Sequence, residues 1–178
     1  GKIGSIGSSA TANVFRPGRI GVISKSGGMT AEVAVALGHA EFGVSTAIGI
    51  GGDTMIGSDF LDMLLLFKND EETDAVVLFG EIGGTYEEQV AEYLASGVFG
   101  KPVVAVVAGR FTEQLPRGTM LGHAGAIVAK GRGSYRSKVD ALRGAGVCVA
   151  DRLEEIPILL KQALYAQQRE RVHNLEHK

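Results

Sequence analysis

The chain has 178 residues, of which 45% are hydrophobic, 18 are basic and 20 are acidic, so its formal net charge is −2. This length can bury the core of one domain, and the balanced charge excludes the basic surface typical of nucleic-acid-binding proteins. No apolar run approaches the roughly 20 residues that span a bilayer, and the single cysteine, Cys148, cannot form an internal disulfide, so we expect a cytoplasmic protein with no nucleic-acid or membrane partner.

The first 18 residues, "GKIGSIGSSATANVFRPG", are rich in glycine and serine and begin with glycine rather than methionine. We interpret residues 1–18 as a lead-in segment and the chain as a piece of a longer polypeptide. Residues 19–165 are predicted to form one domain, and residues 166–178 a polar tail that frays.

Strand and helix signals alternate along the domain. Apolar, β-branched segments predict strands at 19–24, 44–50, 74–80, 102–109 and 147–150. Apolar residues at helical spacing predict helices within 29–43, from about Ser58, from Thr85, within 134–146 and from about Asp151. Such β-α units in series predict an α/β fold, a flavodoxin-like doubly wound parallel sheet of five strands in the order 2-1-3-4-5.

Several acidic residues have a structural interpretation in this scheme. Thr85 and Glu88 form a T-x-x-E pattern, which predicts a capping box at the start of a helix and explains Glu88 better than a catalytic role does. Asp53 and Asp59 flank the loop after the second strand, where turn chemistry and helix capping account for them.

Glycine-rich loops follow the first four predicted strands. They are "SKSGGMT", "GGDTMIG", "GEIGGTYEE" and "GRFTEQLPRGTMLGHAGAI". In a doubly wound fold, ligands bind outside the carboxyl ends of the strands, so these four loops gather at the edge where a site is expected.

The loop after the first strand has the composition of an anion cradle. Ser26, Gly27 and Gly28 would offer backbone N–H groups at a helix N-terminus, where the helix dipole adds about half a positive charge. The loop matches neither a Walker A motif nor a complete G-x-G-x-x-G motif, and an ordinary tight turn is the alternative interpretation.

Two residues of this edge could cooperate in nucleophilic catalysis. Glu81 follows the third strand directly, where it could either form an ion pair or fix the tautomer of a histidine and leave its other nitrogen free. His123 lies among glycines and alanines in the long connection after the fourth strand. It could be a structural histidine, but its small neighbours leave the space that a reactive or mobile group needs.

The remaining polar candidates have ordinary interpretations. His39, His173 and His177 are expected at the surface, and Cys148 in the core. No set of histidine, cysteine and carboxylate residues has the spacing of metal ligands, so no metal site is predicted.

Five segments in chain order resemble the CoA-ligase domain of succinyl-CoA synthetase α subunits. They are "GRIGVISKSGGMTAEV", "IGIGGD", "GEIGG", "KPVVAVVAG" and "GHAGAI". ATP-citrate lyase, citryl-CoA synthetase and malate-CoA ligase belong to the same superfamily. The resemblance extends from about Lys2 to Leu164.

The resemblance implies an acid–thiol ligase of the succinate–CoA ligase type. It implies that His123 is phosphorylated during turnover, that Glu81 hydrogen-bonds His123, and that residues 26–28 bind the phosphate through their amides. Phosphate would pass from a nucleoside triphosphate to the histidine and then to a carboxylic acid, and CoA would displace it from the acyl phosphate.

The resemblance also implies partners. ATP or GTP with Mg²⁺ would bind to a β-type ATP-grasp subunit or domain, and CoA mainly to an N-terminal domain that this chain lacks. We therefore expect a hetero-oligomer acting on a small carboxylic acid, in the cytoplasm or in the mitochondrial matrix of a eukaryote. The isolated chain is expected not to complete the reaction, and to bind at most phosphate or sulfate.

Alternatives remain open on the sequence alone. "SKSGGMT" and the long opening segment are closer to citrate-handling relatives, whereas "MLGHAGAIVAKG" is closer to succinyl-CoA synthetase, so the acid could be succinate, citrate or malate. A second class is a non-catalytic phosphate-binding module for subunit assembly. A receiver or flavin domain fits less well, because "SKSGG" follows the first strand where a receiver has paired acidic residues, and a flavin site usually offers aromatics.

Overall fold

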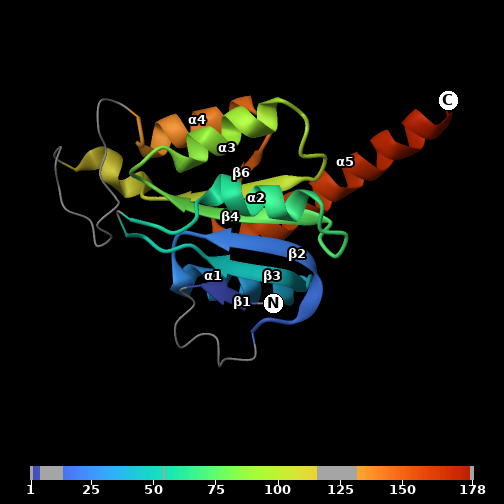
Figure 1. Cartoon of the computed structure of the whole chain (residues 1–178), viewed down its shortest axis with the longest axis horizontal. Helices are drawn as coiled ribbons and strands as arrows, with labels where there is room; N and C mark the ends of the chain where they lie inside the picture. Colours follow the sequence, from blue (N-terminus) through green and yellow to red (C-terminus); the bar gives the residue numbers. More distant parts are fainter. Residues whose placement is uncertain (1, 5–13, 54, 116–131, 177–178) are drawn as a thin grey trace.

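A computed structural model describes residues 2–4, 14–53, 55–115 and 132–176 (Figure 1). Within these residues, six parallel strands form one sheet in the order β1-β3-β2-β4-β5-β6. The strands are β1 (Lys2–Gly4), β2 (Pro17–Ser24), β3 (Val44–Gly49), β4 (Ala75–Glu81), β5 (Val103–Ala108) and β6 (Cys148–Ala150).

The predicted fold class is confirmed. The five predicted strands correspond to β2 through β6, and their order β3-β2-β4-β5-β6 is the predicted order 2-1-3-4-5. The lead-in segment supplies one further edge strand, β1, in which Lys2 pairs with Ala47 and Gly4 with Gly49 of β3. Its glycine-rich sequence carries no strand signal, because the pairing depends on the free edge of β3 rather than on local propensity.

Helices connect the strands in the expected alternation. They are α1 (Gly27–His39), α2 (Phe60–Lys68), α3 (Tyr86–Ala95), α4 (Tyr135–Gly144) and α5 (Ile156–Glu176), with 3₁₀ turns η2 (Arg110–Gln114) and η3 (Leu153–Glu155). The expectation that residues 166–178 fray is wrong for residues 166–176, which continue α5. This part of α5 extends away from the sheet in Figure 1.

Two hydrophobic clusters cover the two faces of the sheet. One contains the buried side chains of α2, α3 and α4, and the other those of α1 and α5. Successive residues of β4 alternate between them: Val76 and Leu78 join the first cluster, and Val77 and Phe79 the second. This arrangement buries β4 on both faces, which explains its continuous apolar sequence.

Candidate functional site

The carboxyl ends of β2 and β4 bring the first two candidate loops together. The two strands are neighbours, and Ser24 at the end of β2 is in register with Phe79 of β4. The turn before α1 and the loop after Glu81 therefore lie side by side at one edge of the sheet, as the sequence predicts.

The turn between β2 and α1 is held by two serines. Ser24 Oγ donates to the Ser26 carbonyl at 2.7 Å and accepts from the Ser26 N–H at 3.1 Å. Ser26 is the N-cap of α1, and its side chain accepts from the Met29 N–H at 3.4 Å. The Ser26 N–H is therefore engaged within the protein, so this structure does not offer it to a ligand in the way that we expected from the sequence.

Gly27 and Gly28 occupy the first two positions of α1, whose N–H groups have no acceptor within a helix. Gly28 is exposed, and a Cβ built on it would approach only the Ser26 Oγ, at 4.0 Å. The backbone at this point is thus accessible. Two N–H groups at the positive end of a helix suit an anion such as a phosphoryl group.

Lys25 is a residue of this edge that the sequence interpretation missed. Its side chain is 3% exposed, and Nζ lies 4.7 Å from the centroid of the Tyr86 ring, a cation–π contact. Tyr86 begins α3, so Lys25 links the turn before α1 to the loop after β4. The sequence pattern that could have identified Lys25 is a lysine directly between a buried strand and a glycine-rich helix start, where its positive charge would attract a phosphate.

Glu81 is the last residue of β4, in register with Ala108 at the end of β5. It is partly buried, and its N–H donates to Glu87 Oε1 at 3.0 Å. The chain then turns through Gly83 and Gly84, which have φ angles of 91° and 59°. A carboxylate at this position faces the same edge as the α1 N-terminus.

The other histidines and acidic candidates have the expected structural settings or lie outside the described residues. His123 and His177 lie outside them, whereas His39 and His173 are exposed on α1 and α5.

Asp59 caps α2 in a reciprocal box with Asp62, with both hydrogen bonds at 3.0 Å, which confirms its capping role. Asp53 is exposed in the loop after β3, and Cys148 is a partly buried free thiol in β6.

Glu88 is not the helix cap that the T-x-x-E pattern predicts. Thr85 makes no side-chain capping bond to α3, and its Oγ1 accepts from Gln89 Nε2 at 3.2 Å instead. Glu88 turns inward, where its Oε1 accepts from the Gly133 N–H and from the Ser137 hydroxyl, both at 3.0 Å. The carboxylate of Glu88 instead forms an ion pair with a buried lysine that lies far along the chain.

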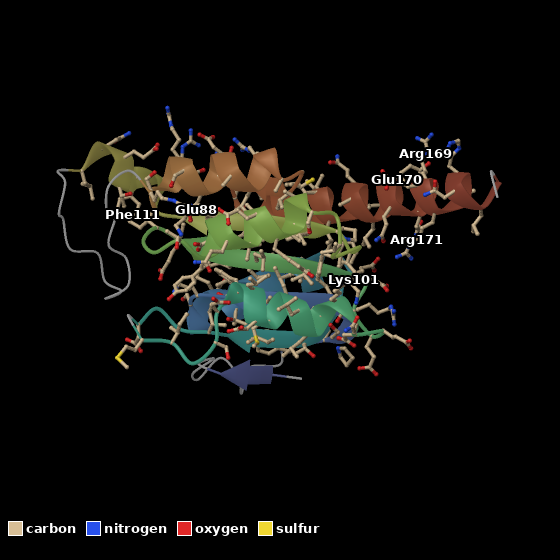
Figure 2. The ribbon with its side chains drawn as sticks, turned by 45° about the horizontal axis from the view of Figure 1, so that its top comes forward. Glu88, Lys101, Phe111, Arg169, Glu170 and Arg171 are labelled. Atoms are coloured by element: carbon tan, nitrogen blue, oxygen red, sulfur yellow. The ribbon has the colours of Figure 1, made fainter. Side chains whose placement is uncertain are left out.

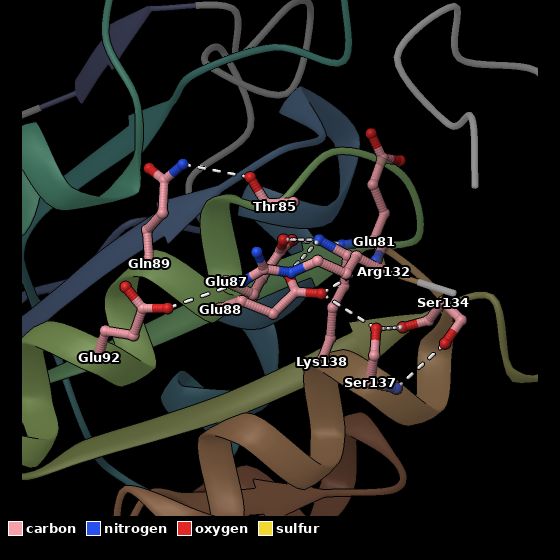
Figure 3. A network of polar contacts seen from close by, with 11 residues as sticks. Glu81, Thr85, Glu87, Glu88, Gln89, Glu92, Arg132, Ser134, Ser137 and Lys138 are labelled. Carbon is pink, nitrogen blue, oxygen red and sulfur yellow. Dashed lines mark hydrogen bonds and ion pairs between the residues drawn. The ribbon is translucent and has the colours of Figure 1, made fainter. Parts of the chain in front are cut away.

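That lysine is Lys138, which is fully buried and donates to both Glu87 and Glu88, with a distance of 3.3 Å to Glu88 Oε2 (Figure 3). We call these three residues the Lys138 cluster. The two glutamates are the second and third residues of α3, so the helix dipole also favours their negative charge.

The two carboxyls of the Lys138 cluster differ in acidity. Burial raises the pKa of Glu87 above its ordinary value, and the shared ammonium of Lys138 offsets this only in part. Burial alone would also raise the pKa of Glu88, but the Gly133 N–H, the Lys138 charge and the Ser137 hydroxyl together bring it below its ordinary value. The hydrogen bond from the Gly133 N–H thus makes Glu88 the more firmly ionised of the two carboxylates that share the Lys138 ammonium.

Metal binding and membrane spanning find no support in the part of the chain that the structure describes. There, no group of three or more histidine, cysteine, aspartate or glutamate residues is placed to hold a metal ion. None of the helices found there combines the length and the apolar character needed to cross a bilayer.

Comparison with known proteins gives a consistent result. The sequence model of the CoA-ligase family matches residues 23–148. An ADP-forming sulfoacetate-CoA ligase subunit of Acholeplasma sp is 46% identical over 149 residues, which are 84% of this chain and 49% of the relative. The ADP-forming succinate–CoA ligase subunit alpha of Methanothermobacter thermautotrophicus is 47% identical over 150 residues, again 84% of this chain and 49% of the relative.

A solved structure agrees with these relatives. ATP citrate lyase of Methanosaeta concilii, in complex with (3S)-citryl-CoA, superposes with a TM-score of 0.78 at 32% identity, over 85% of this chain and 24% of the lyase. The chain spans about half the length of the curated relatives it matches.

Proposed function

The chain belongs to the CoA-ligase family, and we propose that it carries the phosphoryl-transfer site of an acid–CoA ligase, with His123 as the phosphorylated residue. The family match includes residues 26–28, Glu81 and His123. The observation that carries the proposal is the placement of Glu81 beside the N-terminus of α1, at the ends of the neighbouring strands β4 and β2.

The proposed chemistry uses His123 as a nucleophile. A neutral imidazole nitrogen attacks the γ-phosphorus of a nucleoside triphosphate, so that an N–P bond forms and the nucleoside diphosphate leaves. Glu81 accepts a hydrogen bond from the other ring nitrogen and stabilises the positive charge that develops on the ring. The N–H groups of Gly27 and Gly28, assisted by Lys25, offset the charge of the transferred phosphoryl group.

The phosphoryl group then passes to the substrate. A carboxylate oxygen of the acid attacks the phosphorus and releases the imidazole, which gives an acyl phosphate. The thiolate of CoA attacks the acyl carbon, and inorganic phosphate leaves, which gives the thioester. The small residues around His123, Gly122 and Ala124 among them, leave room for the phosphorylated ring to turn between donor and acceptor.

We propose that the acid carries a second anionic group besides the reacting carboxylate. The relatives are named for succinate and for sulfoacetate, and both of these molecules have this feature. Succinate is our first choice. Citrate is the alternative, supported by the likeness to an ATP citrate lyase in complex with citryl-CoA.

We propose that the ligase needs further parts beyond this chain. The relatives are about twice as long and are named as subunits. We assign CoA mainly to an upstream domain, and ATP or GTP with Mg²⁺ to a β-type ATP-grasp partner. The isolated chain would then accept phosphate but not complete the ligation.

The test is to mix the chain with its β-type partner and a nucleoside triphosphate labelled at the γ-phosphate. We expect an acid-labile, base-stable label on His123, lost in His123→Asn and acquired at least about tenfold more slowly in Glu81→Gln. Release of the label by succinate or by citrate then identifies the acid. A chain that stays unlabelled beside an active partner would instead be an assembly module.

A further inference from the structure

The Lys138 cluster accepts hydrogen bonds from two segments near the proposed site, the chain at Glu81 and the chain at Gly133. Each glutamate uses one carboxylate oxygen for Lys138 and the other for a backbone N–H (Figure 3). Glu87 accepts from Glu81, the proposed orienting carboxylate, at 3.0 Å. Glu88 accepts at 3.0 Å from Gly133, which lies ten residues beyond His123 in the sequence.

The two segments also contact each other directly. The Gly83 N–H, two residues after Glu81, donates to the Gly133 carbonyl at 2.7 Å. The loop that begins at Glu81 and the end of the connection that contains His123 are therefore joined by one direct hydrogen bond and by two bonds to the same buried cluster.

Two glycines leave the space that this arrangement requires. A Cβ on Gly80 would lie 2.5 Å from Glu87 Oε1, so a side chain there would push the carboxylate away from β4. A Cβ on Gly133 would lie 2.6 Å from the Gly84 carbonyl oxygen. The close approach of β4, α3 and the chain at Gly133 depends on both.

Burial makes the cluster rigid. Lys138 and Glu87 are 0% and 1% exposed, and an ion pair that has left water is stable only while its partners keep their geometry. Removal of Lys138 would leave two carboxylates next to each other without their cation, and they would separate or admit water. The N–H groups of Glu81 and Gly133 would then lose fixed acceptors.

We propose that the Lys138 cluster is a positioning unit, which fixes Glu81 and the chain at Gly133 relative to each other so that Glu81 meets His123 in one geometry. Lys138, Glu87 and Glu88 are positioning residues that act through backbone hydrogen bonds and do not contact the phosphoryl group. This inference rests on the proposed phosphohistidine function.

The first test is hydrogen exchange of the whole 178-residue chain. In Lys138→Met, the amides of Glu81 and Gly133 should exchange at least about tenfold faster relative to the amide of Val77, in the middle of β4. Lys101→Met is the control, because Lys101 is a partly buried lysine that donates to the carbonyls of Phe67 and Asp70 and lies toward the other end of the sheet from Glu88 (Figure 2). In Lys101→Met, the exchange rates of the Glu81 and Gly133 amides relative to that of Val77 should stay as in the wild type.

A wild-type measurement keeps the inference testable if Lys138→Met does not fold. Under native conditions at low denaturant, the amides of Glu81 and Gly133 should open together, with one opening equilibrium. Independent opening of the two amides in the wild-type chain would overturn the proposal, as would an unchanged exchange ratio in folded Lys138→Met.

The second test measures the reactivity of His123 with phosphoramidate, a small phosphoryl donor that needs no partner subunit. Phosphorylation of His123 is compared with that of the exposed His39 in the same sample by peptide mapping. The ratio should fall by about tenfold to 100-fold in Lys138→Met but not in Lys101→Met. The pH profile of His123 phosphorylation should also change in Lys138→Met, which a loss of stability alone would not cause.

The two tests separate failure of the inference from failure of the proposed function. If wild-type His123 reacts no faster than His39, the phosphohistidine function is wrong, and hydrogen exchange still reports whether the cluster couples Glu81 to Gly133. If wild-type His123 is reactive and Lys138→Met keeps the same ratio and pH profile, the function stands and the positioning role is wrong.

Discussion

Gly133 illustrates how much one residue of this fold can be constrained. Its φ is +78°, a left-handed conformation that costs a residue with a side chain about 1–2 kcal/mol. It is buried between Gly84 and Glu88, so a side chain would meet steric conflict as well. The conformational and steric demands coincide at this one position.

We therefore expect Gly133→Ala to lower the free energy of unfolding by about 2–4 kcal/mol, from the combined backbone strain and overpacking. The measurement is urea unfolding followed by circular dichroism. Gly146→Ala is the control, because Gly146 has a φ of +80° and a Cβ there would have no neighbour within 4 Å. Equal losses in the two variants would show that the contact with Gly84 does not matter.

At the scale of elements, α5 consists of two unlike halves. Ile156 and Leu160 are fully buried against the sheet, whereas Val172 and Leu175 are 55% and 75% exposed. Near the middle of α5, Gln167 Nε2 donates a hydrogen bond to the Gly100 carbonyl at 2.6 Å. Figure 2 shows the distal half, with Arg169 and Glu170, extending beyond the other helices.

This division predicts different outcomes for two changes in the same helix. Removal of residues 172–178 should reduce the helical circular dichroism signal but change the free energy of unfolding by less than about 0.5 kcal/mol. Leu160→Ala should lower it by about 2–5 kcal/mol, because it opens a cavity in the core. A large loss on truncation would mean that the distal half stabilises the fold through contacts with the body.

For the whole molecule, the Lys138 cluster links stability to pH in two directions. The pKa of Glu88 is below its ordinary value, so its contribution is present at neutral pH and is lost as the pH falls through the lowered pKa. The pKa of Glu87 is above its ordinary value, so its contribution is present in acid and is lost as the pH rises through the raised pKa.

Opposite pH trends are therefore expected for two conservative variants. The stability advantage of the wild type over Glu88→Gln should shrink as the pH falls from about 7 to about 3, whereas its advantage over Glu87→Gln should shrink as the pH rises from about 3 to about 7. Urea unfolding at a series of pH values measures both. Trends of the same sign would show that the two carboxyls titrate as one unit rather than with opposed shifts.

The local pattern of apolar residues was sufficient to predict the fold class and the main strands. The continuous apolar run of β4 and the alternation of strands with helical segments predicted a doubly wound parallel sheet and its order, because burial on both faces leaves a direct signature in composition. The cap at Asp59 could also be predicted, since its partner Asp62 is three residues away. The grouping of the turn before α1 with Glu81 followed from the strand order alone.

Contacts between distant residues were decided only by the tertiary structure. Glu88 had a plausible local partner in Thr85 but binds Lys138, 50 residues later, because burying that ammonium requires a carboxylate. The pairing of β1 with β3 likewise depends on how the chain packs. The sequence by itself determined which segments meet at the edge of the sheet, and only the packing of buried charges decided which side chains hold them there.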